Sequence, residues 1–151
     1  MQTSIATPSK PGTSFIPCAT SFYFQGRSDS GLQSVGWGAL ETLDPFTAVG
    51  GGATYAAVSL DPASVLEHPM TTGVVSLSSQ MYSSGVEAKV GTMVLARWVG
   101  GAPLLGYRTM SAGQRIVGVS LFPGAGDAAA GDVTTLWNNV VGWAAEAGGP
   151  S

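Results

Sequence analysis

The sequence predicts a single α/β domain in which one helix packs on a small mixed or parallel sheet. Three observations predict this fold: an apolar hairpin over residues 92–110, a further strand over 115–122, and an amphipathic C-terminal helix over 132–147. Each of these elements has an apolar face that must be buried against another element. Because 151 residues suffice for one core and are short for two, residues 14–148 are expected to form one domain. A mobile arm at 1–13, rich in Pro, Ser and Thr, is expected to precede it.

The hairpin is predicted from two runs of strand-forming residues around a glycine turn. Residues 92–98 (TMVLARW) form the first strand, VGGAP turns the chain, and residues 104–110 return as its partner. In the next strand, 115–122, both alternating sets of side chains are mostly apolar: Val117, Val119 and Leu121 on one face, and Ile116 and Phe122 on the other. Two apolar faces indicate a central strand that is covered on both sides of its sheet.

The C-terminal helix has the clearest pattern. Its apolar residues recur at i, i+3, i+4, i+7, i+8 and i+11 and form one stripe: Val133, Leu136, Trp137, Val140, Val141 and Ala144. Asp132 is the expected N-cap, and Gly148-Gly149 end the helix. Because an isolated helix of this length is marginal in water, its stability must come from packing the stripe on the sheet.

The first half of the chain carries weaker signals. Aromatic and β-branched residues predict a strand over 15–24, a weak helical spacing covers 37–46, and residues 55–60 have the composition of a short strand. Asp61-Pro62 then has the residue types of the N-cap and first position of a single helical turn.

Composition excludes some classes of partner. The formal net charge is −3 and the six basic residues are scattered, whereas nucleic-acid binding needs a clustered basic footprint. No stretch approaches the roughly 18 apolar residues of a membrane-spanning helix, and the first dozen residues lack the apolar run of a signal peptide. Only 10% of residues are charged, against about 25% in typical soluble domains. This low charge favours an extracellular or virion setting over a cytoplasmic one, or burial inside an assembly.

Several segments in order resemble a known fold. They are LEHPMTTGV at 66–74, SSQMYSS at 78–84, TMVLARWVGGAPLLGYR at 92–108, GQRIVGVSLFP at 113–123 and LWNNVVGWAA at 136–145. Over about residues 60 to 145 the chain resembles the C-terminal half of the class I glutamine-amidotransferase-like fold, especially its trehalose-utilisation (ThuA-like) and related bacterial surface-protein branches.

This resemblance implies a flavodoxin-like core with a parallel sheet. Active members have a nucleophilic cysteine in an elbow of the first half, and a histidine after the strand that corresponds to 115–122. Where active members have this histidine, the chain reads Leu121-Phe122-Pro123-Gly124, and the half that would hold the cysteine elbow is largely absent. The resemblance therefore implies the fold without its usual chemistry.

Catalytic candidates are few. His68 is the only histidine and could act as a general base; alternatively, His68-Pro69 ends a short helix and the ring bonds a backbone carbonyl. Cys18 is the only cysteine and could be a nucleophile, but no elbow motif surrounds it, and a small buried apolar residue is the alternative. A metal site needs three or four convergent ligands, and the sequence has no such cluster. Neither a metal nor a cofactor is predicted.

Three aromatic residues are candidates for a binding surface. Trp143 lies at the margin of the helical stripe, so it is expected to be partly exposed and suits an interface; peripheral core is the alternative. Tyr82 could line a cleft, and Trp37 belongs to the aromatic residues that could form a sugar-stacking platform. A carbohydrate ligand is therefore one alternative.

Three functions compete. The first is a non-catalytic binding or assembly module, a degenerate amidotransferase-like domain in a homo-oligomer or larger assembly. A parallel sheet without its first strands would leave a long unpaired edge that a neighbour must cover. The second is a virion or extracellular structural protein, such as a shell or decoration subunit. The third is a hydrolase that uses a serine or Cys18 with His68. Because the sequence shows no complete set of catalytic residues, it favours the first of these functions, the binding or assembly module that is not an enzyme.

Overall fold

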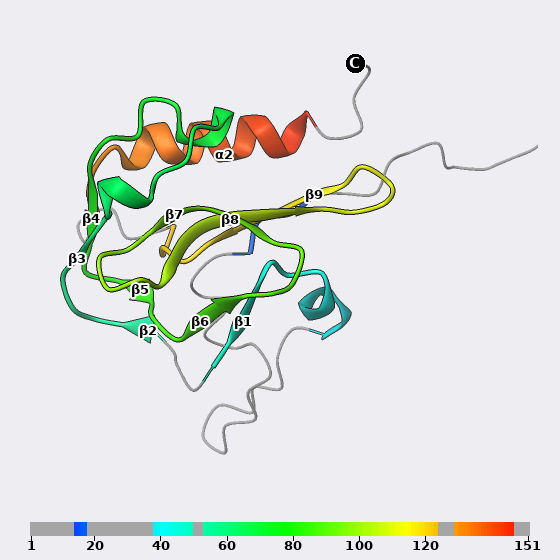
Figure 1. Cartoon of the computed structure of the whole chain (residues 1–151), viewed down its shortest axis with the longest axis horizontal. Helices are drawn as coiled ribbons and strands as arrows, with labels where there is room; N and C mark the ends of the chain where they lie inside the picture. Colours follow the sequence, from blue (N-terminus) through cyan, green and yellow to red (C-terminus); the bar gives the residue numbers. More distant parts are fainter. Residues whose placement is uncertain (1–13, 18–37, 50–52, 124–128, 147–151) are drawn as a thin grey trace, which may run out of the picture.

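A three-stranded antiparallel sheet, covered on one face by a single helix, forms the centre of this computed structural model (Figure 1). The structure describes residues 14–17, 38–49, 53–123 and 129–146. The sheet has the order β7 (Met93–Arg97), β8 (Pro103–Thr109) and β9 (Arg115–Val119), and the helix is α2 (Val133–Ala145). These are the predicted hairpin, third strand and C-terminal helix, so the α/β fold class is confirmed.

Shorter strands surround this centre in antiparallel pairs. The pairs are β1 (Phe46–Ala48) with β6 (Val86–Ala88), β2 (Ala53–Thr54) with β5 (Tyr82–Ser83), and β4 (Leu77–Ser79) with both β3 (Val58–Ser59) and β10 (Ala129–Gly131). Short 3₁₀ helices lie between them: η2 (Gly38–Thr42), η3 (Pro62–Ser64) and η4 (Pro69–Thr71). Single bridges, Leu60 with Trp98 and Tyr82 with Leu121, tie the small sheets to the ends of the central strands.

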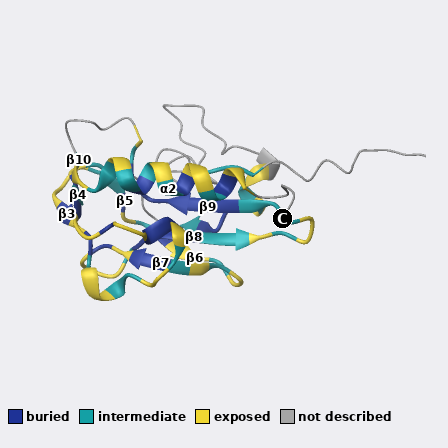
Figure 2. Ribbon diagram, turned by 90° about the horizontal axis from the view of Figure 1, so that it is seen from above, coloured by how far each residue is buried: buried dark blue, intermediate teal, exposed yellow. Residues whose placement is uncertain are grey.

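The main core fills the space between α2 and the central sheet. The side chains that fill it include Leu105, Val117 and Val119 of the sheet and Leu136 and Val140 of the helix stripe. In Figure 2, the buried stretches of β9 and α2 lie next to each other. Trp98 is fully buried among them, and its Nε1–H donates to Ser120 Oγ at 2.9 Å, so its polar atom keeps a partner.

A smaller core lies on the opposite face of the sheet. Phe46 and Val86 of the β1–β6 pair are buried there, with Val94 packed against them. A Cβ on Gly106 of β8 would lie 3.0 Å from the Phe46 ring, so glycine is needed for this close packing. Ile116, on the second face of β9, is also fully buried, which confirms that this strand is covered on both faces.

Both edges of the central sheet are occupied by the chain itself. Along β9, the N–H groups of Val117 and Val119 donate to Phe15 O and Pro17 O, each at 3.1 Å, in a parallel arrangement that makes the sheet mixed. Along β7, Asp61 N–H donates to Arg97 O at 3.0 Å and Leu66 N–H to Leu95 O at 2.8 Å. The expectation of a long unpaired edge is therefore wrong for this sheet, because distant segments of the same chain fill its hydrogen bonds.

Local predictions for the first half are met in part. Asp61 caps η3, with its Oδ1 accepting from Ala63 N–H at 3.1 Å. The weak helical spacing at 37–46 corresponds to the 3₁₀ helix η2, and the strand predicted over 55–60 is limited to β3. Of the strand predicted over 15–24, residues 15–17 are described; the rest, with the arm at 1–13, lies outside the described residues. No helix of the described residues is long and apolar enough to cross a membrane.

Candidate functional site

Three aromatic rings and one arginine from distant parts of the chain meet near the C-terminal end of α2. His68 precedes η4, Tyr107 lies on β8, Arg115 begins β9, and Trp143 lies in the last turns of α2. The ring centroids are 5.1 Å apart for His68 and Tyr107, 5.0 Å for His68 and Trp143, and 4.8 Å for Tyr107 and Trp143. The Arg115 guanidinium carbon lies 4.1 Å from the Trp143 ring centroid. We call these four residues the aromatic cluster.

The fold explains why they meet. In the β8–β9 register Tyr107 is opposite Val117 and Thr109 is opposite Arg115, so Tyr107 and Arg115 share the face that α2 covers. Asn139 of α2 donates from Nδ2 to two carbonyls, that of Met70 within η4 at 3.2 Å and that of Thr72 just after it at 2.8 Å. These bonds hold η4, and with it His68, against the helix.

Arg115 contacts the backbone at the end of α2 as well as the Trp143 ring. Its Nη1 donates to the Trp143 carbonyl at 2.5 Å and lies 4.0 Å from Glu146 Oε1. A cation at a helix C-terminus compensates carbonyls that have no partner within the helix. All four side chains of the cluster are half-buried, so each still presents surface to solvent.

His68 is held as a neutral cap. Its Nδ1 accepts the N–H of Met70 at 3.1 Å, which requires the tautomer protonated on Nε2. Burial, and secondly the charge of Arg115, lower the pKa of His68 below its ordinary value. The predicted bond from the ring to a backbone carbonyl is therefore wrong: Pro69 has no N–H, so Met70 N–H is the donor that needs a cap.

The described residues do not form a nucleophile–base pair at His68. Thr71 Oγ1 and Thr72 Oγ1 donate to the backbone carbonyl of His68, at 3.0 Å and 3.2 Å, and the ring's hydrogen bond goes to Met70. The other catalytic candidate, Cys18, lies outside the described residues. Within the described ranges, no group of three or more His, Cys, Asp and Glu side chains comes together as a metal site would require.

The remaining predicted binding residues lie elsewhere. Tyr82 is half-buried at the edge of the main core, with its ring centroid 5.5 Å from that of Trp98, so it does not join the aromatic cluster. Trp37 lies outside the described residues. Trp143 is half-buried, as its place at the stripe margin predicts. Tyr107 and Arg115 were not among the predicted interface residues; the strand face that they share under the helix is the signal that could have identified them as such.

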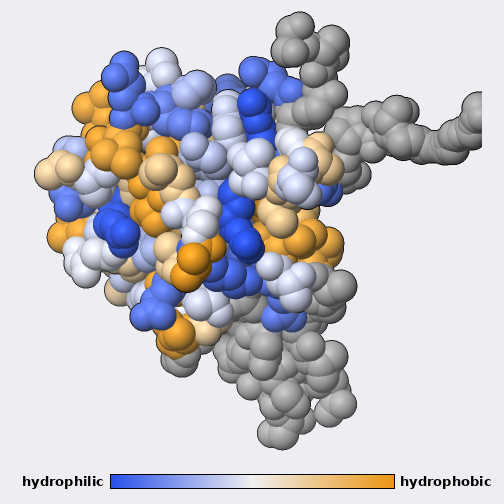
Figure 3. All heavy atoms as spheres, turned by 45° about the vertical axis from the view of Figure 1, so that its right-hand side comes forward, coloured by the Kyte–Doolittle hydropathy of each residue, from blue (hydrophilic) through white to orange (hydrophobic). Residues whose placement is uncertain are grey.

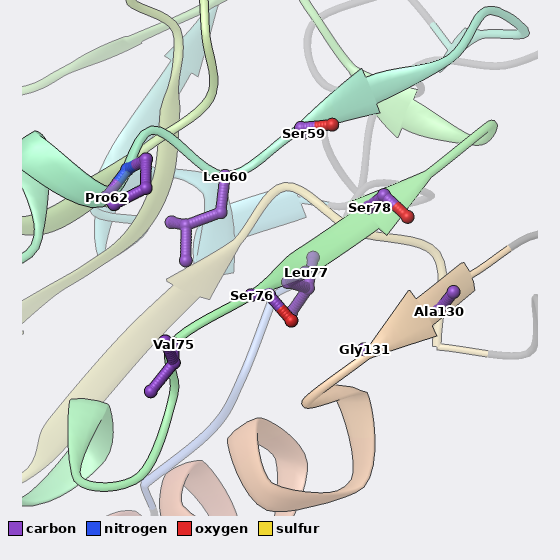
Figure 4. Close-up of a pocket in the computed structure, with 9 residues that line it drawn as sticks. All are labelled: Ser59, Leu60, Pro62, Val75, Ser76, Leu77, Ser78, Ala130 and Gly131. Carbon is purple, nitrogen blue, oxygen red and sulfur yellow. The ribbon is translucent and has the colours of Figure 1, made fainter.

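A second feature is an open pocket of about 410 Å³ beside β3, β4 and β10 (Figure 4). Three serines contribute to its wall, together with apolar residues and backbone (Ser59, Ser76, Ser78, Leu60, Pro62, Val75, Leu77, Ala130, Gly131). We call it the serine pocket. No pattern in the sequence predicted it, because its walls come from three segments that lie far apart in the chain, at residues 59–62, 75–78 and 130–131.

One wall of the serine pocket is held by the start of α2. Asp132 Oδ2 accepts from Val75 N–H at 2.8 Å and Ser76 N–H at 2.9 Å, while Asp132 N–H donates to Ser76 O at 2.7 Å. The bonds from Ser76 and then Val75 lower the pKa of Asp132. Asp132 occupies the predicted N-cap position, but its side chain makes no bond to the first turn of the helix. The carboxylate ties the helix to the β4 segment instead.

Two solved structures have a similar fold. One is the cytoplasmic protein STM1381 from Salmonella typhimurium LT2, with a TM-score of 0.63, 18% identity, and coverage of 90% of this chain and 56% of that chain. The other is the cytoplasmic protein STM3548 from Salmonella typhimurium, with a TM-score of 0.62, 14% identity and the same coverages, 90% and 56%. The chain thus spans little more than half the length of either neighbour, and the likeness shows the fold alone. No protein-family model and no curated protein matches the chain.

These comparisons correct one expectation and leave another without support. Both neighbours are called cytoplasmic proteins, which contradicts the extracellular or virion setting inferred from low charge. Low charge is equally compatible with a protein whose surface is covered by partners. The amidotransferase-like resemblance implies a parallel sheet, whereas the paired strands described here are antiparallel. The names of the two neighbours do not mention an amidotransferase, so the comparisons add no support for the resemblance.

Proposed function

We propose that this chain is a non-catalytic binding module that associates with a second copy of itself through the aromatic cluster. The observation that carries the proposal is the gathering of Trp143, Tyr107 and Arg115, half-exposed, at one surface. Tryptophan, tyrosine and arginine are the residue types that contribute most binding energy at protein interfaces. In line with the names of the two structural neighbours, the proposal takes the setting to be cytoplasmic.

An exposed apolar side chain extends this surface. Met93 on β7 is the register partner of Tyr107, so the two side chains lie on the same face of the sheet. Met93 is 49% exposed. On the side of the molecule seen in Figure 3, hydrophobic side chains form separate patches among polar ones. Patches of that kind suit a modest, reversible interface better than an obligate one.

The charges of the surface favour a second copy as the partner. Arg115 and the exposed Glu146 lie side by side, with 4.0 Å between Nη1 and Oε1. A two-fold contact brings the same patch of both copies together, so Arg115 of one protomer can face Glu146 of the other. An exposed ion pair within one chain contributes little stability, so exchanging it for a pair between copies costs little.

The state of His68 supports binding without catalysis. The chain has one histidine, and its Nδ1 is occupied by the cap to Met70 N–H. A general base needs an unoccupied nitrogen within reach of the proton that it removes. The ring instead packs against both Tyr107 and Trp143, which also contact each other, and it supports their positions.

Sedimentation equilibrium from micromolar to millimolar concentration tests the proposal. The wild-type chain is expected to show a monomer–dimer equilibrium that Met93→Asp and Glu146→Lys both weaken. Val99→Asp is the matched control, since Val99 is also exposed, at 61%, but follows the opposite end of β7. A monomer at every concentration would overturn the proposal, as would a dimer that neither variant weakens.

A further inference from the structure

The serine pocket presents hydroxyl groups that have no partner among the described residues. Within the described part of the chain, no hydrogen bond joins the hydroxyl of Ser59, Ser76 or Ser78 to another protein group. The hydroxyls of Ser64 and Ser79, in contrast, do make such bonds. Each serine hydroxyl can donate one hydrogen bond and accept two. Figure 4 shows the oxygens of the three serines directed to the same side of the β3–β4 pair.

The strand register explains this common direction. Ser59 is opposite Ser78, and Ser78 is opposite Ala130. Residues directly opposite each other lie on one face of a sheet, and Ser76, two residues before Ser78, lies on that face too. Three hydroxyls therefore line one side of the sheet, where Ala130 adds no bulk.

The backbone around the hydroxyls is rigidly held. Asp132 makes three hydrogen bonds to residues 75 and 76, at 2.7 to 2.9 Å. Gly131 lies so close to Ser76 that a Cβ at this position would be 2.9 Å from the Ser76 carbonyl carbon. A pre-formed site loses less conformational entropy when a ligand binds.

The pocket also discriminates by charge. No residue that lines it carries a charged side chain. The nearby Asp132 carboxylate already accepts two backbone N–H groups, and its charge disfavours an anion in the pocket. The lining is suited to a ligand that offers hydroxyl groups for the serines and C–H surface for Leu60, Pro62 and Val75.

We propose that the serine pocket binds a neutral polyhydroxylated small molecule of the size of a mono- or disaccharide. Its volume of about 410 Å³ falls within the roughly 300–1,000 Å³ typical of small-ligand sites. Because sugar hydroxyls both donate and accept, they match serine hydroxyls in either direction. The pocket is open to solvent, so binding is weak and selects for hydroxyl pattern.

Saturation-transfer NMR with the full chain tests this site. The probes are glucose, galactose, maltose and sucrose at millimolar concentration, with gluconate as an anionic comparison. At least one neutral sugar is expected to bind saturably, and gluconate more weakly. The double variant Ser59→Ala/Ser78→Ala is expected to weaken binding about tenfold or more, since two hydrogen bonds are lost. Ser111→Ala, at an exposed turn away from the pocket, is the control and leaves binding unchanged.

Two results would overturn the assignment: no saturable binding of any neutral probe, or equal binding by wild type and the double variant. The circular dichroism and unfolding midpoint of the double variant are measured alongside, and both are expected to match the wild type because Ser59 and Ser78 lie on the outer face of the sheet. The serine pocket lies apart from the aromatic cluster, so the double variant also leaves self-association unchanged. Failure of one proposal is thereby distinguishable from failure of the other.

Discussion

Replacing Gly131 by alanine tests how tightly α2 is joined to the β4 segment, because a matched glycine is available. Gly131 has φ +87° and Gly113 has φ +88°, so both occupy the left-handed region that disfavours alanine. They differ in their surroundings: nothing lies within 4 Å of a Cβ at Gly113, whereas a Cβ at Gly131 would overlap the Ser76 carbonyl and approach Leu77 Cα to 3.0 Å.

The expected magnitudes follow from this difference. Gly113→Ala is expected to lower the free energy of unfolding by about 1–2 kcal/mol, through the backbone conformation alone. Gly131→Ala carries the same backbone destabilisation and in addition displaces the Ser76 carbonyl, which accepts from Asp132 N–H at 2.7 Å. Overpacking of this kind costs about 1–3 kcal/mol more, so the free energy of unfolding is expected to fall by at least about 2 kcal/mol.

Urea unfolding followed by tryptophan fluorescence measures both variants against the wild type. The two variants share the same backbone term, so the gap between them reports the contact with Ser76. Equal losses of stability in Gly131→Ala and Gly113→Ala would refute the close docking of α2 onto the β4 segment.

Three further predictions concern the core, the cap and the helix start. Leu136→Ala is expected to lower the free energy of unfolding by about 2–5 kcal/mol, because Leu136 is buried in the main core. Val141 is exposed on the same helix, so Val141→Ala is expected to lower it by less than about 0.5 kcal/mol. If urea unfolding gave a loss below about 0.5 kcal/mol for both variants, the docked helix would be excluded. His68→Asn keeps an N-cap acceptor and His68→Ala does not, so thermal denaturation is expected to find the alanine variant about 1 kcal/mol less stable; equal stabilities would contradict the cap. Backbone hydrogen bonds lower the pKa of Asp132, so its contribution is present above the ordinary Asp pKa of about 3.9 and is lost as pH falls through the folded-state pKa. The stability difference between wild type and Asp132→Ala should shrink over that acid range, and a difference independent of pH would contradict this linkage.

The sequence carried enough information for the elements with strong periodicity. The α2 stripe has nearly two apolar residues in every turn, and the buried ones are Leu136, Val140 and Ala144, which follow one another at intervals of four residues. The hairpin and β9 were predicted for the same reason, since their apolar runs are long and end at glycine turns. Val141 shows the limit of the pattern: it belongs to the stripe in sequence but is 54% exposed, because it lies at the stripe's far margin.

The elements that sequence reasoning missed are short and paired over long distances. β1, β6 and β10 have three residues each, too few for an alternating pattern. Their positions depend on partners far away in the chain, such as Phe46 with Ala88. The parallel pairing of Phe15 with Ile116 is likewise decided by tertiary packing, which local propensity does not encode.

The candidate site was predictable only in part. Trp143 could be identified from helical geometry, and His68 because it is the sole histidine. The positions that bring them together are set by two bonds from Asn139 to the backbone around η4 and by the β8–β9 register. Neither is visible in a single sequence, so the aromatic cluster becomes evident only in three dimensions.

Self-association through the aromatic cluster is tested most directly by the indole N–H resonances of the tryptophans in a dilution series. Trp143 lies in the cluster, whereas Trp98 is fully buried with its N–H bonded to Ser120 Oγ and serves as an internal reference. The Trp143 resonance is expected to shift with concentration between micromolar and millimolar while the Trp98 resonance stays constant. A Trp143 resonance that does not move over this range would contradict the proposed interface.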